Sequence, residues 1–174
     1  MGLRPNYRVG KLWEIPLSFL KENGIQGLIL DVDNTLTSHN NPEPEEKAVR
    51  WLEDMRLAGI ALIIVSNNTK ERVTPFAKRL GLPFVAWGKK PLTSGIRKAC
   101  RRMGLAPSQV GVVGDQIFTD IWGANRSGCV SILVEPIQLE DTFFFHLKRR
   151  WEKPFTKGPS VTCILSGKDE RGKK

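Results

Sequence analysis

The sequence has few cysteines and histidines, and it has no paired cysteine motif. Its cysteines, Cys100, Cys129 and Cys163, are far apart, and none belongs to a C-x-x-C pair. This pattern argues against a zinc ribbon and against a disulfide framework. The two histidines are too few for a histidine-based metal site. We therefore expect the cysteines to be structural or incidental.

Long hydrophobic runs are also missing. The longest runs are short, such as residues 27–30 and 60–65, whereas a membrane-spanning helix needs about 20 apolar residues. Residues 1–7 lack the apolar stretch of a secretory signal. We therefore expect a cytoplasmic protein without a transmembrane segment, which a peripheral contact could hold at the inner face of a membrane.

Acidic residues are outnumbered by basic ones. The 27 Lys and Arg and 18 Asp and Glu give a net charge of +9 and a pI of about 9.7. This excess favours polyanionic surroundings, such as nucleic acid, anionic lipid or phosphorylated small molecules, but it does not choose among them. Many solvated proteins are basic without any such partner. The length of 174 residues, 40% of them hydrophobic, fits one domain with a sizeable core.

Short apolar segments alternate with segments of helical composition. The apolar segments predict strands at residues 27–30, 60–65, 83–86, 110–113 and 129–134. The intervening segments predict helices at residues 11–23 (broken at Pro16), 45–58, 69–80, 91–103, 117–126 and 143–151. We expect helix 45–58 to bury Ala48, Val49, Leu52, Met55 and Leu57. The alternation predicts an α/β fold, in which a parallel sheet has helices on both faces.

One domain accounts for residues 1–156 in this interpretation. Its core covers about 25–135, a helical lead-in covers 1–24, and a last helix covers about 142–152. The basic end, residues 157–174, is expected to be a loose tail.

Four polar clusters come directly after four of the predicted strands. They are Asp31-x-Asp33-x-Thr35, Ser66-Asn67-Asn68, Lys89-Lys90-Pro91, and Gly114-Asp115 with Asp120. The carboxyl ends of parallel strands lie at one edge of the sheet, so the clusters should meet in one crevice. Acidic groups there would repel one another unless a cation were present, and carboxylate oxygens suit Mg²⁺. A lysine and a hydroxyl nearby would complete an anion site for a phosphate.

Each cluster alone has an ordinary structural explanation. Asp and Asn are common in turns, and Ser66 could cap the next helix. A lysine before a proline is usually solvated. The order and spacing of the four clusters together favour a functional site.

The same clusters carry a family resemblance. Residues 31–36, D-V-D-N-T-L, resemble the first motif of the haloacid dehalogenase-like (HAD) hydrolase superfamily, subfamily IIIA. Residues 65–68, Lys90 and residues 114–120 resemble its second, third and fourth motifs in the same order. The K-K-P, G-D-Q-x-x-T-D and G-A-N-R-S-G segments are similar to the YqeG branch, which contains the mitochondrial phosphatidylglycerophosphate phosphatases. The resemblance implies a three-layer Rossmann-like fold and hydrolysis of phosphatidylglycerophosphate to phosphatidylglycerol.

The resemblance also implies roles for the motif residues. Asp31 would attack phosphorus and form an aspartyl-phosphate, and Asp33 would act as general acid and then base. Mg²⁺ would be held by the Asp31 carboxylate, the Asp33 backbone carbonyl and Asp115. Substrate phosphate would contact Ser66, Asn67 and Lys90, with Lys89 as the rival lysine. Thr35 would support the loop, and Asp120 would either assist the metal's waters or cap the following helix.

No cap domain is expected, because the gaps between the motifs are short. About 30 residues separate Asp33 from Ser66, and one helix with two loops fills them. An uncapped site suits a phosphate presented by something large, such as a lipid surface. Two groups are candidate membrane contacts: aromatic residues 143–145 beside the basic run 146–151, and an apolar group near the N-terminus. That second group is Trp13, Leu17, Phe19 and Leu20. Residues 143–145 could instead plug the core against the sheet, because three consecutive aromatics do not form one helical face.

Two other functions use the same observations. A soluble phosphatase acting on sugar phosphates, nucleotides or phosphoproteins would need the same catalytic residues. A basic RNA-binding module with an idle site is less favoured, because the basic stretches lack aromatic platforms at the spacing of single-strand binders. The residues alone do not decide between the lipid and the soluble substrates.

Overall fold

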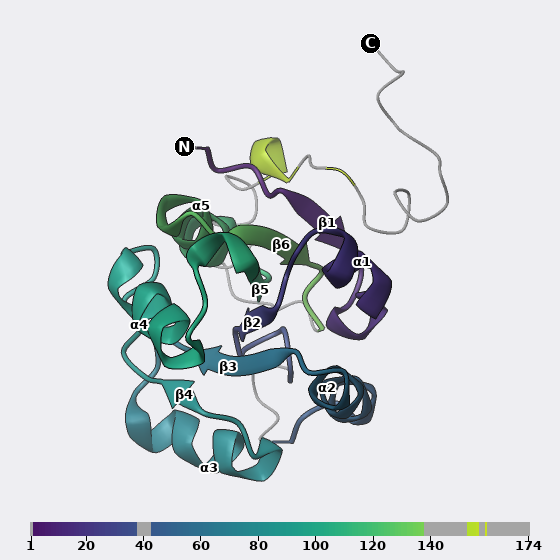
Figure 1. Cartoon of the computed structure of the whole chain (residues 1–174). Helices are drawn as coiled ribbons and strands as arrows, with labels where there is room; N and C mark the ends of the chain where they lie inside the picture. Colours follow the sequence, from purple (N-terminus) through teal and green to yellow (C-terminus); the bar gives the residue numbers. More distant parts are fainter. Residues whose placement is uncertain (1, 38–42, 138–152, 157–158, 160–174) are drawn as a thin grey trace.

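A computed structural model describes residues 2–37, 43–137, 153–156 and 159 of the chain. It contains a six-stranded sheet in the order β1-β6-β5-β2-β3-β4, in which every neighbouring pair is parallel (Figure 1). The strands are β1 (Tyr7–Val9), β2 (Gly27–Leu30), β3 (Ala61–Val65), β4 (Phe84–Val85), β5 (Val110–Gly114) and β6 (Val130–Val134). The predicted α/β fold is confirmed.

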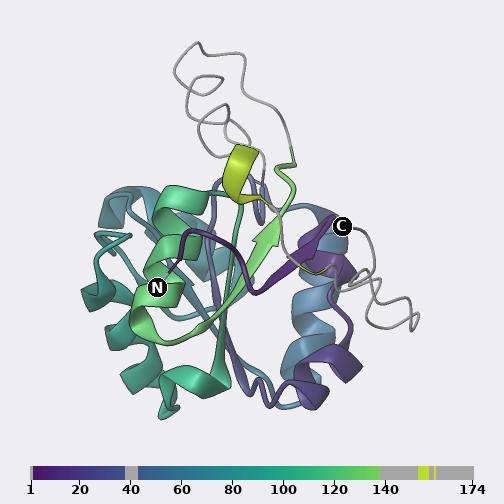
Figure 2. The ribbon, with the colours of Figure 1, turned by 90° about the horizontal axis from the view of Figure 1, so that it is seen from above.

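Helices cover both faces of this sheet, as Figure 2 shows from above. They are α1 (Leu17–Glu22), α2 (Glu46–Leu57), α3 (Lys70–Leu80), α4 (Thr93–Met103) and α5 (Trp122–Ser127). Buried side chains of α1, α2 and α3 belong to one apolar cluster, and those of α4 and α5 belong to a second. The described residues between β2 and β5 are accounted for by this layered core, and none of them forms a cap domain.

The central strands are apolar throughout because both of their faces are covered. In β2, Leu28 and Leu30 join the first cluster, whereas Ile29 joins the second. All three side chains are fully buried. Burial of this kind stabilises the fold by about 1.5–3 kcal/mol for each large apolar side chain. The core therefore fixes where each strand ends, and the strand ends carry the polar clusters.

The N-terminal segment departs from the predicted helical lead-in. Residues 11–23 form a 3₁₀ turn (Leu12–Glu14) followed by α1, but Tyr7–Val9 forms the edge strand β1 beside β6. A three-residue strand is too short to show a periodic pattern. It is held by tertiary pairing, including a bond from Asn6 N to Ser131 Oγ of 2.9 Å. Arg8 N also donates to Pro159 O at 2.9 Å, so this residue of the predicted loose tail lies along β1.

Helix α2 buries a different face from the predicted one. Its buried residues are Ala48, Trp51, Leu52 and Met55, at helical spacings of three and four. Val49 and Leu57 are 38% and 82% exposed, so the prediction was wrong for both. Trp51 is drawn inward because its indole N–H donates to Ile15 O at 2.8 Å.

Two helix beginnings also differ from the predictions. Helix α4 begins at Thr93 rather than at Pro91, which follows Lys90 through a cis peptide bond. The predicted helix 117–126 begins with a π-helical turn, Ile117–Ile121, before α5. Both differences lie at the edge of the sheet where the polar clusters meet, and π-turns inside helices are frequent at functional sites.

One predicted membrane contact belongs to the core. Phe19 and Leu20 are fully buried, so they are not available to a lipid surface. The other predicted contact, residues 143–151, lies outside the described residues, as does the predicted last helix. Among the helices that the structure describes, none combines the length and the apolar character needed to cross a membrane.

Candidate active site

Asp31 is the first residue beyond β2, and its position is set by the sheet. Its backbone N–H donates to Val113 O at 3.0 Å, which continues the pairing of β2 with β5. The chain then turns tightly, because the N–H groups of Thr35 and Leu36 both donate to Val32 O. Asn34, at φ +59°, occupies the left-handed region that asparagine tolerates well. The turn leaves Asp31 and Thr35 buried and Asp33 at its outer side.

The segment after β3 holds the loop that follows β4. Ser66 is buried, and its hydroxyl accepts from Asn68 N at 3.1 Å. The side-chain amide of Asn67 bonds both backbone groups of Lys90: its Oδ1 accepts from Lys90 N at 2.7 Å, and its Nδ2 donates to Lys90 O at 2.9 Å. Both polar atoms of the Asn67 side chain therefore position Lys90, and a contact of Asn67 with phosphate stays a prediction. Helix α3 is capped by Thr69 and not by Ser66.

Lys90 reaches into the centre of the site. Its Nζ lies 2.6 Å from Asp31 Oδ1 and 2.6 Å from Asp120 Oδ1, and the side chain is 3% exposed. The rival Lys89 is exposed on the surface. The loop that carries Lys90 packs tightly on α4, and this packing brings Lys90 close to the carboxylates. The contact is so tight that a Cβ added to Gly95 of α4 would lie 2.3 Å from Gly88 O in the loop. The geometry therefore selects Lys90 as the lysine that meets the acidic cluster.

The end of β5 supplies two further carboxylates. Asp115 directly follows the strand and is fully buried, and Asp120 is carried back toward it by the π-helical turn. Asp120 Oδ2 accepts from Gln116 N at 3.2 Å, and Asp120 Oδ1 accepts from Lys90 Nζ at 2.6 Å. A Cβ on Gly114 would lie 2.4 Å from the Asp120 carboxyl, which explains the glycine at that position. The Asp120 carboxylate therefore links the start of this turn to Lys90.

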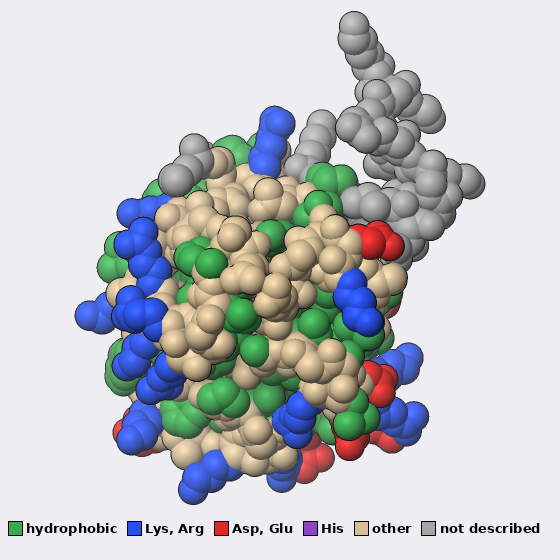
Figure 3. All heavy atoms as spheres, viewed as in Figure 1, with side chains coloured by type: hydrophobic (Ala, Val, Ile, Leu, Met, Phe, Trp, Pro, Cys, Tyr) green, Lys and Arg blue, Asp and Glu red, His purple; other side chains and the backbone are tan. Residues whose placement is uncertain are grey.

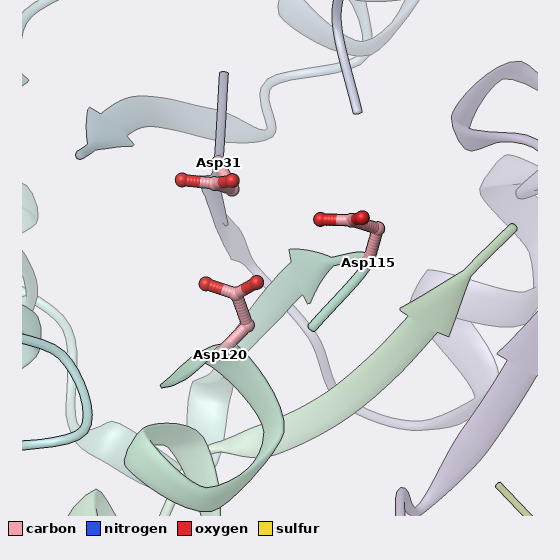
Figure 4. A group of neighbouring side chains, drawn as sticks. All are labelled: Asp31, Asp115 and Asp120. Atoms are coloured by element: carbon pink, nitrogen blue, oxygen red, sulfur yellow. The ribbon is translucent and has the colours of Figure 1, made fainter. Parts of the chain in front are cut away.

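Three buried carboxylates converge in this arrangement, as Figure 4 shows. One oxygen from each of Asp31, Asp115 and Asp120 lies within 4.8 Å of the other two. If all were ionised, these three side chains and the Lys90 ammonium would carry two net negative charges in a buried place. Hard carboxylate oxygens in such a group fit a divalent cation. Asp31, Asp115 and Asp120 are the side chains that could hold it.

Burial and neighbouring charges shift the pKa values of Asp31 and Lys90. Burial raises the pKa of Asp31 to about 7, against the lowering effect of Lys90 and with help from the negative charges of Asp120 and Asp33. Burial alone would lower the pKa of Lys90, but the Asp120 and Asp31 carboxylates outweigh it and raise the pKa above its ordinary range. Lys90 therefore stays charged at neutral pH, whereas Asp31 needs a further positive charge to be fully ionised.

Asp33 is held from a different direction. Asn68 Nδ2 donates to Asp33 Oδ2 at 2.6 Å, and an Arg72 guanidinium nitrogen lies 3.3 Å from Asp33 Oδ1. The sequence interpretation missed Arg72. The only signal was its place in the first turn of the helix after the second polar cluster, where a side chain can reach the strand ends.

Comparison with known proteins gives consistent matches. The family model described as "Mitochondrial PGP phosphatase" matches residues 2–138. "Probable phosphatase YqeG" of Bacillus subtilis (strain 168) is 37% identical over 149 residues, which are 86% of this chain and 87% of that protein. "Phosphatidylglycerophosphate phosphatase 1, chloroplastic/mitochondrial" of Arabidopsis thaliana is 27% identical over 158 residues, covering 85% of this chain. This chain spans only 45% of the length of the plant protein.

Solved structures share the fold at low sequence identity. An uncharacterized protein from Listeria monocytogenes serotype 4b has a TM-score of 0.55 at 20% identity, over 68% of this chain and 85% of that chain. The cobalt-bound deoxy-D-mannose-octulosonate 8-phosphate phosphatase (YrbI) from Haemophilus influenzae has a TM-score of 0.52 at 13% identity, over 75% and 77%. At these identities the likeness concerns the fold alone.

Proposed function

Because the chain belongs to the mitochondrial PGP phosphatase family of HAD-type hydrolases, we propose that this phosphatase removes the terminal phosphate of phosphatidylglycerophosphate and leaves phosphatidylglycerol. The observation that carries the proposal is the buried group of Asp31, Asp115 and Asp120 around Lys90 at the carboxyl ends of the strands. A site of this kind can hold a cation and a phosphate together, and positioning of these charges is most of phosphoryl transfer.

Asp31 is the proposed nucleophile. Its carboxylate stands at the end of β2, held by the sheet on one side and by Lys90 on the other. Attack on phosphorus would form an aspartyl-phosphate and break the bond to the lipid oxygen. Asp33, two residues on, would protonate that oxygen as it leaves and then take a proton from the water that hydrolyses the intermediate.

Lys90 and Ser66 are the proposed phosphate contacts. The Lys90 ammonium is fixed by Asn67 through its backbone and by Asp120 through its side chain, so it loses little freedom when phosphate binds. The buried Ser66 hydroxyl lies at the neighbouring strand end. Asp31 and Asp115, with the Asp33 backbone carbonyl, would hold Mg²⁺, and the ion would offset negative charge on the phosphoryl oxygens. Thr35 supports the turn that carries Asp31 and Asp33.

The lipid substrate is favoured over a small soluble one by three features. The described core has no cap domain to enclose a metabolite, the chain is strongly basic, and the plant relative is named as a phosphatidylglycerophosphate phosphatase. An anionic phospholipid presented at a membrane surface would supply both a large scaffold for the phosphate and an attraction for the basic protein.

The test is phosphate release from phosphatidylglycerophosphate in detergent micelles with Mg²⁺, beside a panel of soluble phosphomonoesters. We expect the wild type to hydrolyse the lipid in preference to the panel. We expect Asp31→Asn to lose at least about a thousandfold in kcat, because an amide is a poor nucleophile. Asp54→Asn, at an exposed carboxylate on α2, is the matched control and should keep full activity.

Other outcomes would change the proposal in defined ways. Turnover of the soluble panel alone, still dependent on Asp31, would keep the mechanism and replace the lipid by a metabolite. Lipid turnover that survives Asp31→Asn would overturn the proposed nucleophile.

A further inference from the structure

A long part of the chain contains no acidic residue. Residues 72–114 include nine Lys and Arg and no Asp or Glu, so this segment alone accounts for a charge of +9, equal to the net charge of the whole chain. Of these nine, only Lys90 is buried. The basic character of the protein is therefore local, and it lies in the part of the fold that runs from α3 through α4.

Helix α4 displays much of this charge on one face. Its exposed basic residues are Arg97, Lys98, Arg101 and Arg102, at helical spacings of one, four and five, opposite the buried Ile96, Ala99 and Cys100. Within the described residues, none of the four forms an ion pair with a carboxylate. Figure 3 shows Lys and Arg side chains gathered in a column along the side of the molecule on which α4 lies. Like charges left unpaired at such density attract an anionic partner.

The charge continues into a hollow along the open edge of the sheet. This hollow, of about 520 Å³, lies beside the edge strand β4 and is lined by Lys70, Trp87, Lys98 and Arg102 among others, with no acidic side chain in its lining. Arg102 donates to Phe84 O at 2.6 Å, which fixes its guanidinium at the hollow. The wall therefore offers three cations and two aromatic residues, Phe84 and Trp87, to the same ligand.

Exposed apolar side chains flank the active-site lysine. Trp87 is 61% exposed and Leu92 is 52% exposed, and both belong to the loop that carries Lys90. The loop is tied to the site, since Trp87 N donates to Asn68 O at 3.0 Å and Leu92 N donates to Lys89 O at 2.7 Å. A surface that contacts these two side chains lies next to the loop that supplies Lys90.

We propose that Trp87 and Leu92, together with Lys89 and the basic face of α4, form a docking surface for an anionic lipid membrane. Tryptophan prefers the headgroup level of a bilayer, leucine inserts below it, and basic side chains bind anionic headgroups. A nucleic acid would use cations and an aromatic platform but has no use for an exposed leucine. The inference rests on the proposed function, and it assigns to that function the face of the protein that meets the lipid.

The test uses sedimentation of the full-length protein with vesicles. One set contains equal parts of phosphatidylcholine and phosphatidylglycerol, and the other contains phosphatidylcholine alone. We expect binding to the anionic vesicles only, decreasing as salt is raised. Because these vesicles contain no phosphomonoester and no turnover is measured, the result is independent of the micelle assay. If the protein does not bind anionic vesicles but does hydrolyse the lipid in micelles, the docking surface is rejected and the proposed function is kept.

Two variants locate the surface. Trp87→Asn with Leu92→Ser removes both apolar groups and suits the backbone, because Trp87 has φ +52° and Leu92 is the extended residue before α4. We expect at least about a tenfold loss of vesicle binding. Arg97→Gln with Arg101→Gln tests the charge on exposed positions of α4 and should lower binding and weaken its salt dependence.

A matched control separates this surface from exposed apolar groups in general. Leu57→Ser removes a leucine of α2 that is 82% exposed. Helix α2 packs in a different apolar cluster from α4, so this variant should bind vesicles as the wild type does. Wild-type protein that ignores anionic vesicles at low salt would overturn the proposal, as would unchanged binding in both double variants. Tighter binding to single-stranded RNA that survives Trp87→Asn with Leu92→Ser would overturn it in favour of a nucleic-acid surface.

Discussion

At the scale of single residues, Lys90 shows how one side chain joins distant parts of the sequence. Its ammonium bonds Asp31, which is 59 positions away, and Asp120, which is 30 positions away. Its neighbour Lys89 has the same chemistry but is exposed. The difference comes from the loop, because Asn67 holds both backbone groups of Lys90 and aims its side chain inward.

This contrast predicts different results for two adjacent substitutions. Lys90→Met should destabilise the metal-free protein by about 3 kcal/mol, because it leaves buried carboxylates without their counter-charge. Added Mg²⁺ should recover part of that loss by supplying positive charge. Urea unfolding with and without a chelator measures both effects. Lys89→Met should change stability by less than about 0.5 kcal/mol, and equal losses at the two positions would contradict the assignment.

At the scale of elements, α4 and the loop after β4 approach each other closely. Gly95 on the helix faces Gly88 in the loop, with no room for a side chain between them. The loop carries Lys90 to the site and exposes Trp87 and Leu92 at the surface. Helix packing and active-site geometry are therefore coupled through a glycine pair.

Gly95→Ala tests this coupling. In a free helix the change would stabilise by about 1 kcal/mol, because alanine is the better helix former. Here the added Cβ would lie 2.3 Å from Gly88 O and 2.7 Å from Gly88 Cα, both of which are backbone atoms. We expect a net loss of about 1–3 kcal/mol in thermal or urea unfolding and a fall in kcat. Ser94→Ala, exposed on the same helix, should be neutral, and a stabilised Gly95→Ala would refute the close packing.

At the scale of the whole molecule, the buried acidic group links folding to pH and to metal. The pKa of Asp31 is about 7 in the folded protein and 3.8 in the ordinary, solvated carboxyl. Below about pH 4, Asp31 is protonated in both the folded and the unfolded chain, and the folded state has its full stability. That stability is lost as pH rises through about 7, because the unfolded chain ionises Asp31 freely whereas burial disfavours its ionised form in the folded protein. A bound divalent cation would reverse the preference and hold Asp31 ionised.

Comparing the wild type with Asp31→Asn isolates this effect. Without metal, the variant should gain about 2 kcal/mol of stability relative to the wild type between pH 5 and pH 8. Added Mg²⁺ should raise the unfolding temperature of the wild type more at pH 8 than at pH 5, and that of the variant little at either pH. Differential scanning calorimetry gives both quantities. A Mg²⁺ effect that is equal at the two pH values would show that Asp31 is not a ligand.

Much of the fold was readable because strand and helix patterns are local. The strand Gly27–Leu30 was predicted with its observed bounds, and β3, β5 and β6 differ from the predictions by one residue at an end. The short edge strand β1 was missed because three residues carry no periodic pattern and depend on their partner. The buried face of α2 was misassigned because Trp51 was left out of it, although Ala48, Trp51, Leu52 and Met55 repeat at helical spacings of three and four.

The sequence by itself determined which residues could carry the chemistry, since the D-x-D, S-N-N, K-P and G-D clusters each follow an apolar strand and strand order alone brings strand ends together. Only the tertiary structure decided which of those residues contact one another. It turned Asn67 onto the Lys90 backbone, brought Asp120 beside Asp31 and Asp115, and added Arg72 to Asp33. These outcomes depend on loop geometry and on close packing between elements far apart in the chain, and no local pattern encodes either one.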